Sequence, residues 1–391
     1  MSRLSALLPF IFTLSSASTA SASPASVEWN LRFRHERVTD VAFAPQARAD
    51  TARLRLALRA ALGQAGFLLV EAEGIAAAGN DYNSGANGRT AWPGITDPRG
   101  AEINQALLGW SNTRATASLG RQTITWDNQR WIGNVGWRQN EQSFDSVAVQ
   151  FNPAKDIVVR YAWLDRVHRI AGDDAIDPLA RHRQMNSHLV NVAYKRGPQQ
   201  WVGYAYLHDD QDVESASTAT YGLRWSGTAN PRWGWTAELA RQVDHAGNRL
   251  DFAHAYWLLE PSLQARGMTW KLGWEHLGGN GRHALQTPLA TLHAFNGWAD
   301  KFTTTPVAGL DDVYLSANGK TGKFAWTAAW HDYRADDGGQ HFGRELDLSV
   351  GRALGAHWNG LLKFADYRSD GFARDTRKFW MQAEYTGSHK F

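Results

Sequence analysis

Residues 377–391, RKFWMQAEYTGSHKF, set the period that the rest of the chain repeats. Every second residue from Phe379 to Tyr385 is apolar, and two of the three residues between them, Gln382 and Glu384, are polar. Alternation of this kind is typical of a strand with one apolar and one polar face. The chain then ends on Phe391.

The same alternation recurs along the chain. It is found in residues 27–37, 51–60, 217–227, 232–242, 267–276 and 344–352. One such segment means little, since residues 51–64 also tolerate a helical pattern. Many segments of about ten residues each predict a large antiparallel sheet with one apolar face.

The connections between these segments alternate in length. Short ones are expected at 152–156, 195–200, 228–232, 320–323 and 354–358, and long ones at 77–102, 166–186, 278–309 and 332–343. Tight turns on one side and longer loops on the other are typical of an outer-membrane barrel. We therefore predict an all-β, transmembrane antiparallel β-barrel of about eighteen strands. Sixteen is the alternative, because both faces of residues 67–75, 250–259 and 359–367 carry apolar residues.

The N-terminus predicts export. Residues 1–22 combine Arg3, an apolar stretch and the small-residue site Ala20-Ser21-Ala22, as a secretory signal peptide does. A membrane anchor is the alternative, but the apolar stretch is short and interrupted. Residues 23–391 are expected to form one barrel domain in the Gram-negative outer membrane.

Composition narrows the classes of function. The chain has no cysteine, 19 Trp and 36 Gly, and a mean hydropathy of −0.44. Many Trp without long apolar runs suggest aromatic belts at a membrane interface, with Trp29, Trp233, Trp270 and Trp326 as candidates. The 41 basic and 38 acidic residues are nearly balanced, so no nucleic-acid partner is expected.

Two segments stand outside the alternation. The first is GRQTITWDNQRWIGNVGWRQNEQSFD, residues 120–145, and the second is TPLATLHAFNGWADKF, residues 287–302. Together with the strand rhythm and the terminal Phe391, they resemble the alginate export family of outer-membrane proteins over essentially the whole mature chain. That resemblance implies an eighteen-stranded monomeric barrel with a pore narrowed by inward-folded loops and lined by arginines. It also implies passage of an alginate-like polyuronate.

The second segment is too apolar for an ordinary surface loop and too irregular for a strand. Irregular backbone is allowed at membrane depth where it is buried in protein or lines a water-filled cavity. We expect the segment from Gln286 to Phe302 to fold inward as a constriction, with an outer loop packed on its neighbours as the alternative. The constriction candidates are His293, Asn296, Trp298, Asp300 and Lys301.

Basic residues collect on the polar face of the predicted strands, and we expect this face to line the lumen. The pore-lining and substrate-binding candidates are Arg32, Arg34, Arg53, Arg55, Arg59, Arg121, Asp127, Asn128, Arg130, Arg138, Arg160, Arg224 and Lys271. Acids on the same face are Glu28, Glu36, Glu238, Glu275, Glu345 and Asp347. Rings of Arg favour anions, because the guanidinium stays charged and grips carboxylates. Paired charges that only stiffen the wall are the alternative.

Residues 120–145 offer the sharpest cluster. Arg121, Arg130 and Arg138 are the favoured constriction arginines in this segment. Trp126, Trp131 and Trp137 could stack on sugar rings with their flat indole faces. A purely structural loop network is the alternative.

The predicted function is a passive channel for anionic saccharides or related carboxylated solutes. The alternatives are a nutrient-uptake porin for small sugars or organic acids, a barrel enzyme acting on lipid, and an adhesin. No P-loop, nucleophile elbow or metalloprotease motif is present, and the 14 His are scattered, so no cofactor, catalytic residue or metal site is expected. Outer-membrane lipid and lipopolysaccharide are the expected surroundings, and the sequence does not specify a periplasmic partner.

Overall fold

The computed structural model describes residues 25–391, so the predicted signal peptide lies outside the described residues. Eighteen strands follow one another along this part of the chain. They are β1 (Ala25–Asp40), β2 (Ala47–Leu62), β3 (Gly66–Asp81), β4 (Gly100–Ser111), β5 (Ala115–Gln122), β6 (Ser143–Ala154), β7 (Ile157–His168), β8 (His182–Arg196), β9 (Gln199–His208), β10 (Thr218–Thr228), β11 (Trp233–Asp244), β12 (Ala253–Ala265), β13 (Met268–Leu277), β14 (Leu310–Thr321), β15 (Phe324–Arg334), β16 (His341–Ala353), β17 (Trp358–Ser369) and β18 (Thr376–Lys390).

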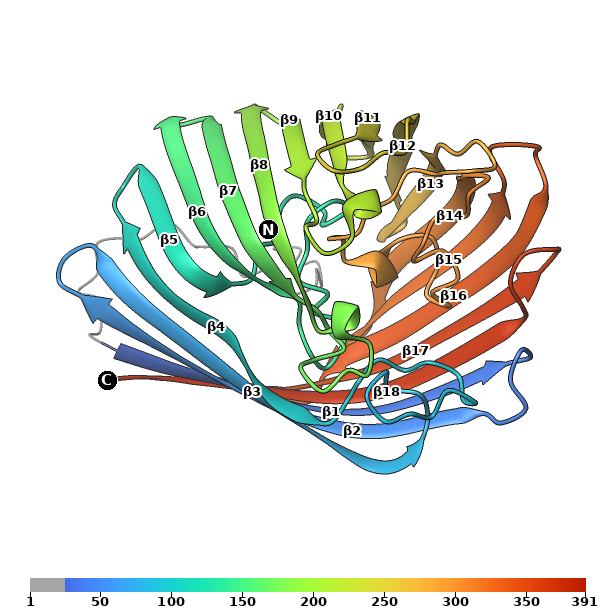
Figure 1. The fold of residues 1–391 in the computed structure, drawn as a ribbon, viewed down its shortest axis with the longest axis horizontal. Helices are drawn as coiled ribbons and strands as arrows, with labels where there is room; N and C mark the ends of the chain where they lie inside the picture. The colour runs from blue at the N-terminus through green and yellow to red at the C-terminus, as the bar shows by residue number, and fades with distance from the viewer. Residues whose placement is uncertain (1–24) are drawn as a thin grey trace.

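Each strand pairs antiparallel with the next, and β1 pairs with β18, so the sheet closes on itself (Figure 1). The closing register runs from Ser26 opposite Lys390 to Asp40 opposite Thr376. Closure satisfies every strand edge, which a sheet in lipid requires. The prediction of eighteen strands is confirmed, and the alternative of sixteen is wrong.

The three segments that were hardest to assign are all strands. Residues 67–75 lie within β3, and residues 359–367 lie within β17. The expected strand at 250–259 begins later, at Ala253, and continues to Ala265 as β12. The long connection expected at 77–102 is shorter, since β3 extends to Asp81 and β4 starts at Gly100.

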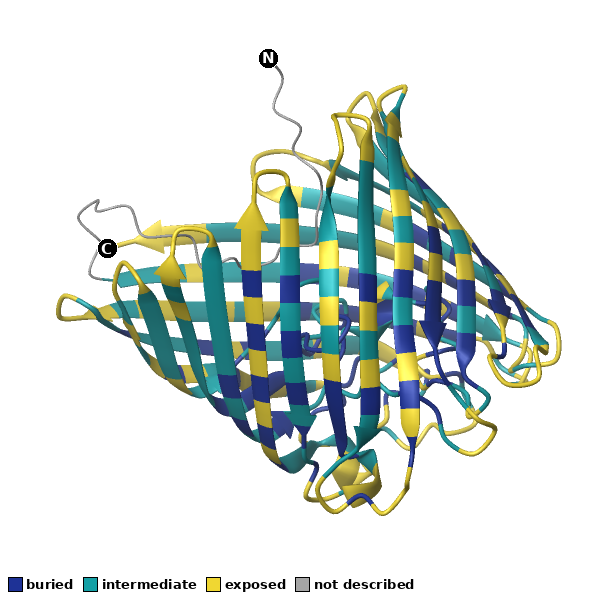
Figure 2. Ribbon diagram, turned by 90° about the horizontal axis from the view of Figure 1, so that it is seen from above, coloured by how far each residue is buried: buried dark blue, intermediate teal, exposed yellow. Residues whose placement is uncertain are grey.

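The alternation in sequence becomes an alternation of burial (Figure 2). On β2, Leu54, Leu56 and Leu58 are 45%, 47% and 43% exposed, whereas Arg53 is 1% exposed. The exposed apolar residues therefore point out of the barrel and the arginines point into it. An apolar outer wall around a closed barrel suits a lipid bilayer, and it places the chain in the Gram-negative outer membrane.

The connections sort by length, as predicted. Short turns lie at 63–65, 112–114, 155–156, 197–198, 229–232, 266–267, 322–323 and 354–357. The other end carries 41–46, 82–99, 123–142, 169–181, 209–217, 245–252, 278–309, 335–340 and 370–375. Both ends of the described chain lie at the short-turn end, which is the periplasmic side of such barrels.

Two of the long loops fold into the barrel. We call residues 123–142 the first inner loop and residues 278–309 the second inner loop. The second contains the 3-10 turn η3 (Leu292–Ala294), which Figure 1 shows inside the ring of strands. Two further 3-10 turns are η1 (Pro178–Ala180) and η2 (Glu214–Ala216). Within residues 25–391, no helix is both long enough and apolar enough to cross a membrane.

Candidate functional site

The two inner loops are bonded to each other. The amide of Gly133 donates to the carbonyl of Leu289 at 2.9 Å, and the amide of Thr291 donates to the carbonyl of Gln129 at 3.1 Å. The side chain of Gln142 then donates to the carbonyls of Gly133 (2.9 Å) and Leu289 (3.1 Å). The loops therefore form one unit inside the lumen, as we expected for the second segment.

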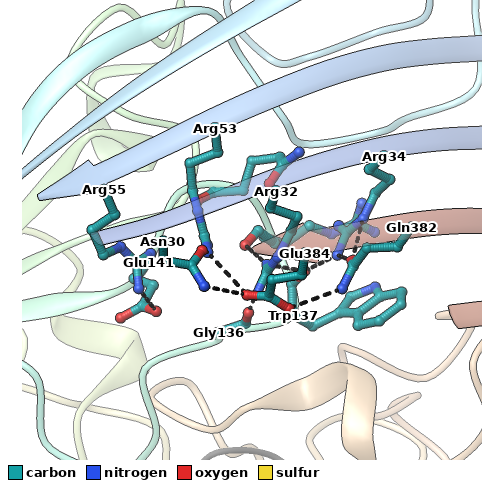
Figure 3. Close-up of polar contacts among 12 residues, drawn as sticks. Asn30, Arg32, Arg34, Arg53, Arg55, Gly136, Trp137, Glu141, Gln382 and Glu384 are labelled. Atoms are coloured by element: carbon teal, nitrogen blue, oxygen red, sulfur yellow. Dashed lines mark hydrogen bonds and ion pairs between the residues drawn. The ribbon is translucent and has the colours of Figure 1, made fainter. Parts of the chain in front are cut away.

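Arginines of β1 and β2 hold the first inner loop by its backbone carbonyls (Figure 3). Arg32 Nη1 donates to the carbonyls of Gly136 (3.1 Å) and Arg138 (3.2 Å). Arg34 Nη2 donates to the carbonyl of Trp137 at 2.5 Å. A guanidinium offers five donors in a rigid fork, so one side chain can anchor several loop carbonyls. These arginines are predicted lumen residues, and here they fasten the constriction.

Acids compensate the arginines that face each other. Arg32 and Arg53 are directly opposite in the β1–β2 register. Two like charges in such a pair destabilise the sheet. Glu384 lies near both, with Oε1 3.3 Å from Arg32 and 3.6 Å from Arg53 (Figure 3). Arg53 also donates to the carbonyl of Gln139 in the first inner loop at 3.3 Å.

Arg55 continues this row along β2 toward the periplasmic end. Its guanidinium bonds Glu73 of β3 at 2.5 Å and also Glu141 of the first inner loop. Its side chain is 13% exposed. The wall and the loop are therefore joined by alternating positive and negative charge at this point.

Arg138 joins three different segments. Its Nη1 lies 3.0 Å from Glu36 of β1 and 4.0 Å from Asp97 of the 82–99 loop, and its Nη2 lies 3.3 Å from Asp300. The residue is 7% exposed. One buried cation therefore ties the first inner loop to the wall, to a neighbouring loop and to the second inner loop.

Arg130 and Asn296 form a further contact between the loops. Arg130 donates to Asn296 at 3.1 Å and pairs with Glu275 of β13 at 2.9 Å. Asn296 donates to Glu275 at 2.7 Å and to Asp312 of β14 at 3.1 Å. All four side chains are buried, so the cluster is shielded from solvent screening.

Wall carboxylates receive the backbone of the second inner loop. The amide of Trp298 donates to Asp347 at 3.1 Å, and the amide of Ala299 donates to Glu345 at 2.6 Å. Both acids stand on the lumen face of β16. Carboxylates that bond backbone amides make strong, directional contacts.

His293 sits at the centre of the constriction. Its ring stacks on Trp137, with centroids 4.8 Å apart, and it lies between Asp300 (Nδ1, 2.7 Å) and Lys363 (Nε2, 2.7 Å). Burial lowers the pKa of His293 to about 3, so the ring is neutral at pH 7, donating to Asp300 and accepting from Lys363. Although burial alone would raise it, His293 and the cations nearby hold the pKa of Asp300 well below its usual value.

Gly297 permits the close approach of the second inner loop to the wall. Its φ is +85°, and a Cβ there would overlap the hydroxyl of Tyr333 and the carboxylate of Glu345. Gly297→Ala is expected to displace this loop and raise single-channel conductance in planar bilayers. The control is Gly338→Ala, where φ is +82° but a Cβ meets open space. Equal conductance of the two variants would contradict the docking described here.

The other predicted pore residues also have identifiable neighbours. Those with a counter-charge are Arg160 near Asp127 (3.7 Å), Arg224 near Glu238 (3.9 Å), Lys271 with Glu260 (2.9 Å) and Lys301 with Asp40 (2.6 Å). Asn128 accepts from the amide of Arg130 at 3.3 Å. Arg59 is exposed, with its guanidinium 3.7 Å from the ring centroid of Phe67. The structure thus brings together the candidates of the constriction and leaves Arg59, Arg160, Arg224 and Lys271 on other parts of the wall.

Arg121 does not belong to the constriction. It shares its face of β5 with Leu119, which is 60% exposed on the outer wall, while Gln122 is buried on the opposite face. Its guanidinium pairs with Asp145 at 2.9 Å and reaches the carbonyl of Ile103. The expectation that Arg121 lines the pore is therefore wrong, because strand register turns it outward.

The tryptophans of the first inner loop are packed against protein. Trp131 is 8% exposed and donates to Glu238 at 2.8 Å, while Trp137 carries the ring of His293. Their predicted use as sugar platforms is not supported by this packing. By contrast, Trp233 and Trp270 are 51% and 38% exposed near the short-turn end, as belt residues should be.

Sequence reasoning missed several residues of the constriction. Lys363 of β17 reaches His293 and lies 3.7 Å from the ring centroid of Trp298, and Lys378 of β18 pairs with Asp300 at 2.6 Å. Asp97 comes from the 82–99 loop, which was predicted as a long connection but without any functional residue. Lys378 shares the lumen face of β18 with Trp380 and alternates with the outward-facing Phe379, so the period of β18 could have identified it. Nothing in the sequence around Lys363 sets it apart.

The comparisons with known proteins agree with the architecture. No protein-family model matches the chain, and no curated protein sequence matches it. Among solved structures, OccAB2 of Acinetobacter baumannii aligns with a TM-score of 0.75 over 94% of this chain and 98% of its own, at 13% identity. The outer membrane protein OpdK of Pseudomonas aeruginosa aligns with a TM-score of 0.71 over 93% of this chain and 99% of its own, at 13% identity.

At such identities the likeness concerns the fold alone. The comparisons support the barrel part of the resemblance to alginate export proteins and give no support to that family in particular. The chain is an outer-membrane β-barrel with the fold of OccAB2 and OpdK.

Proposed function

We propose that the chain is a passive outer-membrane channel through which small carboxylated solutes are taken up. An eighteen-stranded barrel is wide enough to leave an aqueous channel. Here two inner loops, bonded to each other and to the wall, narrow that channel. A narrow passage suits small solutes better than an open pore would. Because one chain closes its own barrel, we also infer that one chain makes one pore.

The row of arginines on β1 and β2 carries the preference for carboxylates. Arg32 of β1 lies opposite Arg53 of β2, and Arg55 and Arg59 follow Arg53 on the lumen face toward the short-turn end. Arg59 is the exposed member of this group, so it is the guanidinium that an anion entering from the short-turn end can meet. A structure of OpdK with vanillate, an aromatic carboxylate, is among the similar structures.

Anion preference can be measured as the reversal potential across a bilayer in a KCl gradient. We expect the wild type to favour chloride, and Arg59→Gln to reduce the chloride-to-potassium permeability ratio by about twofold, as the loss of one exposed, screened charge would. Arg59 suits this test because it is exposed and holds neither inner loop. Arg121→Gln, on the outer wall, should leave the ratio unchanged. A cation-preferring wild type would contradict the proposal.

Alginate-like polyuronates are the wider substrate class that the sequence suggested. Small carboxylates and polyuronates can be distinguished in the same bilayer experiment, because a solute that enters the pore interrupts the current. Benzoate-type monocarboxylates should interrupt the current if small acids are the substrate. Block by oligouronates alone would favour a polyuronate channel instead.

A barrel enzyme acting on lipid would need a nucleophile beside a histidine on the outer wall. Within residues 25–391, one serine is hydrogen-bonded to a histidine, Ser187 to His208 at 3.3 Å, and both residues are buried inside the barrel. The His35–Asp50 pair does lie on the outward side, at 2.7 Å, but Phe379 and not a serine is its ring neighbour. These contacts favour a channel.

A further inference from the structure

Two histidines lie side by side where the long loop 169–181 connects β7 to β8. His168 ends β7 and His182 begins β8, and the two are directly opposite in register, with ring centroids 6.0 Å apart. Asp173 of the connecting loop joins them. One ligand atom from each of the three side chains lies within 4.8 Å of the other two. The expectation that the histidines form no ligand cluster is therefore wrong at this place.

A second carboxylate orients one of these histidines. Asp145 Oδ2 lies 2.9 Å from His168 Nε2, and Arg121 holds the other oxygen of Asp145 at 2.9 Å. A carboxylate on Nε2 fixes the tautomer with its proton there and leaves Nδ1 as a lone-pair donor. Metal-binding histidines almost always have such a partner on their other nitrogen.

The position of Asp173 is also fixed. Its backbone amide donates to Glu102 of β4 at 2.9 Å. The preceding residue, Gly172, has φ of +73°, and a Cβ there would overlap the same Glu102 carboxylate. Within residues 25–391, the side chains of Asp173 and His182 take part in no hydrogen bond or ion pair. Both side chains are therefore open to solvent and free to bind an ion.

We propose that His168, His182 and Asp173 bind a divalent transition-metal ion of the Zn²⁺ class at the outer rim of the barrel. Two imidazoles and one carboxylate suit Zn²⁺, Ni²⁺ or Cu²⁺, whereas Ca²⁺ and Mg²⁺ take oxygen ligands. Three protein ligands leave one position of a tetrahedral site open to water. The site lies at the end of β7 and outside the constriction, so it is independent of the proposed transport.

In a second His/Asp group, the possible ligand atoms already bond other protein groups. His276, Asp311 and Asp336 also lie within reach of one ion. There, however, His276 Nδ1 bonds Asp311 at 3.0 Å, and Asp336 accepts from the amide of Gly279 at 3.0 Å. Because these ligand atoms already bond protein groups, the cluster needs no metal to explain it.

The test is Zn²⁺ titration of the purified barrel in detergent against a competing fluorescent chelator, with folding of every variant checked by heat-modifiable migration. One Zn²⁺ per chain is expected for the wild type. His182→Gln and Asp173→Asn should each weaken binding at least tenfold. Asp145→Asn should weaken it by about 10–100-fold, as loss of such a partner typically does.

His188→Gln is the matched control, because His188 is an exposed histidine of the same strand that bonds Tyr161 and no ligand of the site. It should bind Zn²⁺ as the wild type does. Two results would overturn the proposal. One is wild-type binding no tighter than that of a His168→Gln, His182→Gln double variant. The other is binding abolished by Asp336→Asn and untouched by His182→Gln.

Discussion

Barrels in which residues 286–302 are replaced by a short Gly-Ser linker are expected to conduct several-fold more current than the wild type. This segment carries the residues that bond the first inner loop and the wall, among them Thr291, Asn296 and Asp300. Its removal leaves an eighteen-stranded ring with a far wider lumen. Single-channel recording in planar bilayers measures the change directly.

The control for this replacement is an outer loop of the same barrel. Residues 246–250 lie within the 245–252 loop between β11 and β12. Replacing them with the same linker should leave conductance near the wild-type level. Both variants must be folded, as shown by heat-modifiable migration in gels. Unchanged conductance of the folded 286–302 variant would mean that the segment is an outer cap, the alternative that the sequence left open.

Arg138→Met is expected to have the second largest effect. The substitution keeps a long side chain but leaves Glu36, Asp97 and Asp300 buried near one another without their shared cation. Removing one partner of a buried ion pair typically costs about 3–5 kcal/mol. The cost falls on the docking of the two loops, because the strands keep their own ladders. We expect larger and noisier single-channel currents in a barrel that still folds.

Arg121→Met is the matched comparison for Arg138→Met. Both arginines were constriction candidates on the basis of sequence, and both pair with aspartates. Arg121 lies on the outer wall, so its loss should leave the current unchanged. Equal effects of the two substitutions would contradict the placement of Arg138 between the loops.

The strands could be predicted because their physical cause is local. A strand in a barrel wall must alternate between lipid and lumen, and Phe379 and Met381 against Gln382 and Glu384 record that requirement in sequence. Even β3 and β17, which carry apolar residues on both faces, could be predicted as strands from the spacing of the neighbouring strands. On the lumen face of β17, Ala365 and Tyr367 are buried, and the ring of Tyr367 packs near Phe302 of the second inner loop.

The position of the inner loops in the sequence could be predicted, but not the contacts that hold them to the wall. The apolar, irregular sequence of the second inner loop indicated that it needs protein or an enclosed lumen around it, and this is where it lies. The anchors of the inner loops could not be foreseen, because Arg32 and Arg34 bind backbone carbonyls about a hundred residues away. A carbonyl has no sequence signature, so the arginines were interpreted as free pore charges.

Arg121 shows the limit of assigning a face from charge. It was placed in the lumen as one of the basic residues on the polar face of the predicted strands. Near the long-loop end of β5, however, Asp145 gives it a partner on the outer wall, and Asp145 also bonds His168. His168 and His182 are likewise brought together by the β7–β8 register, and no spacing in the sequence indicates their proximity.

The central claim is that both inner loops are docked as one unit inside the lumen. Hydrogen exchange of the barrel in detergent, read by mass spectrometry, tests it directly, because the amides of Gly133, Thr291 and Ala299 all donate to protein acceptors. Peptides covering 129–142 and 287–302 should be protected almost as strongly as the strands. Exchange of these peptides as fast as that of the 245–252 loop would contradict the account.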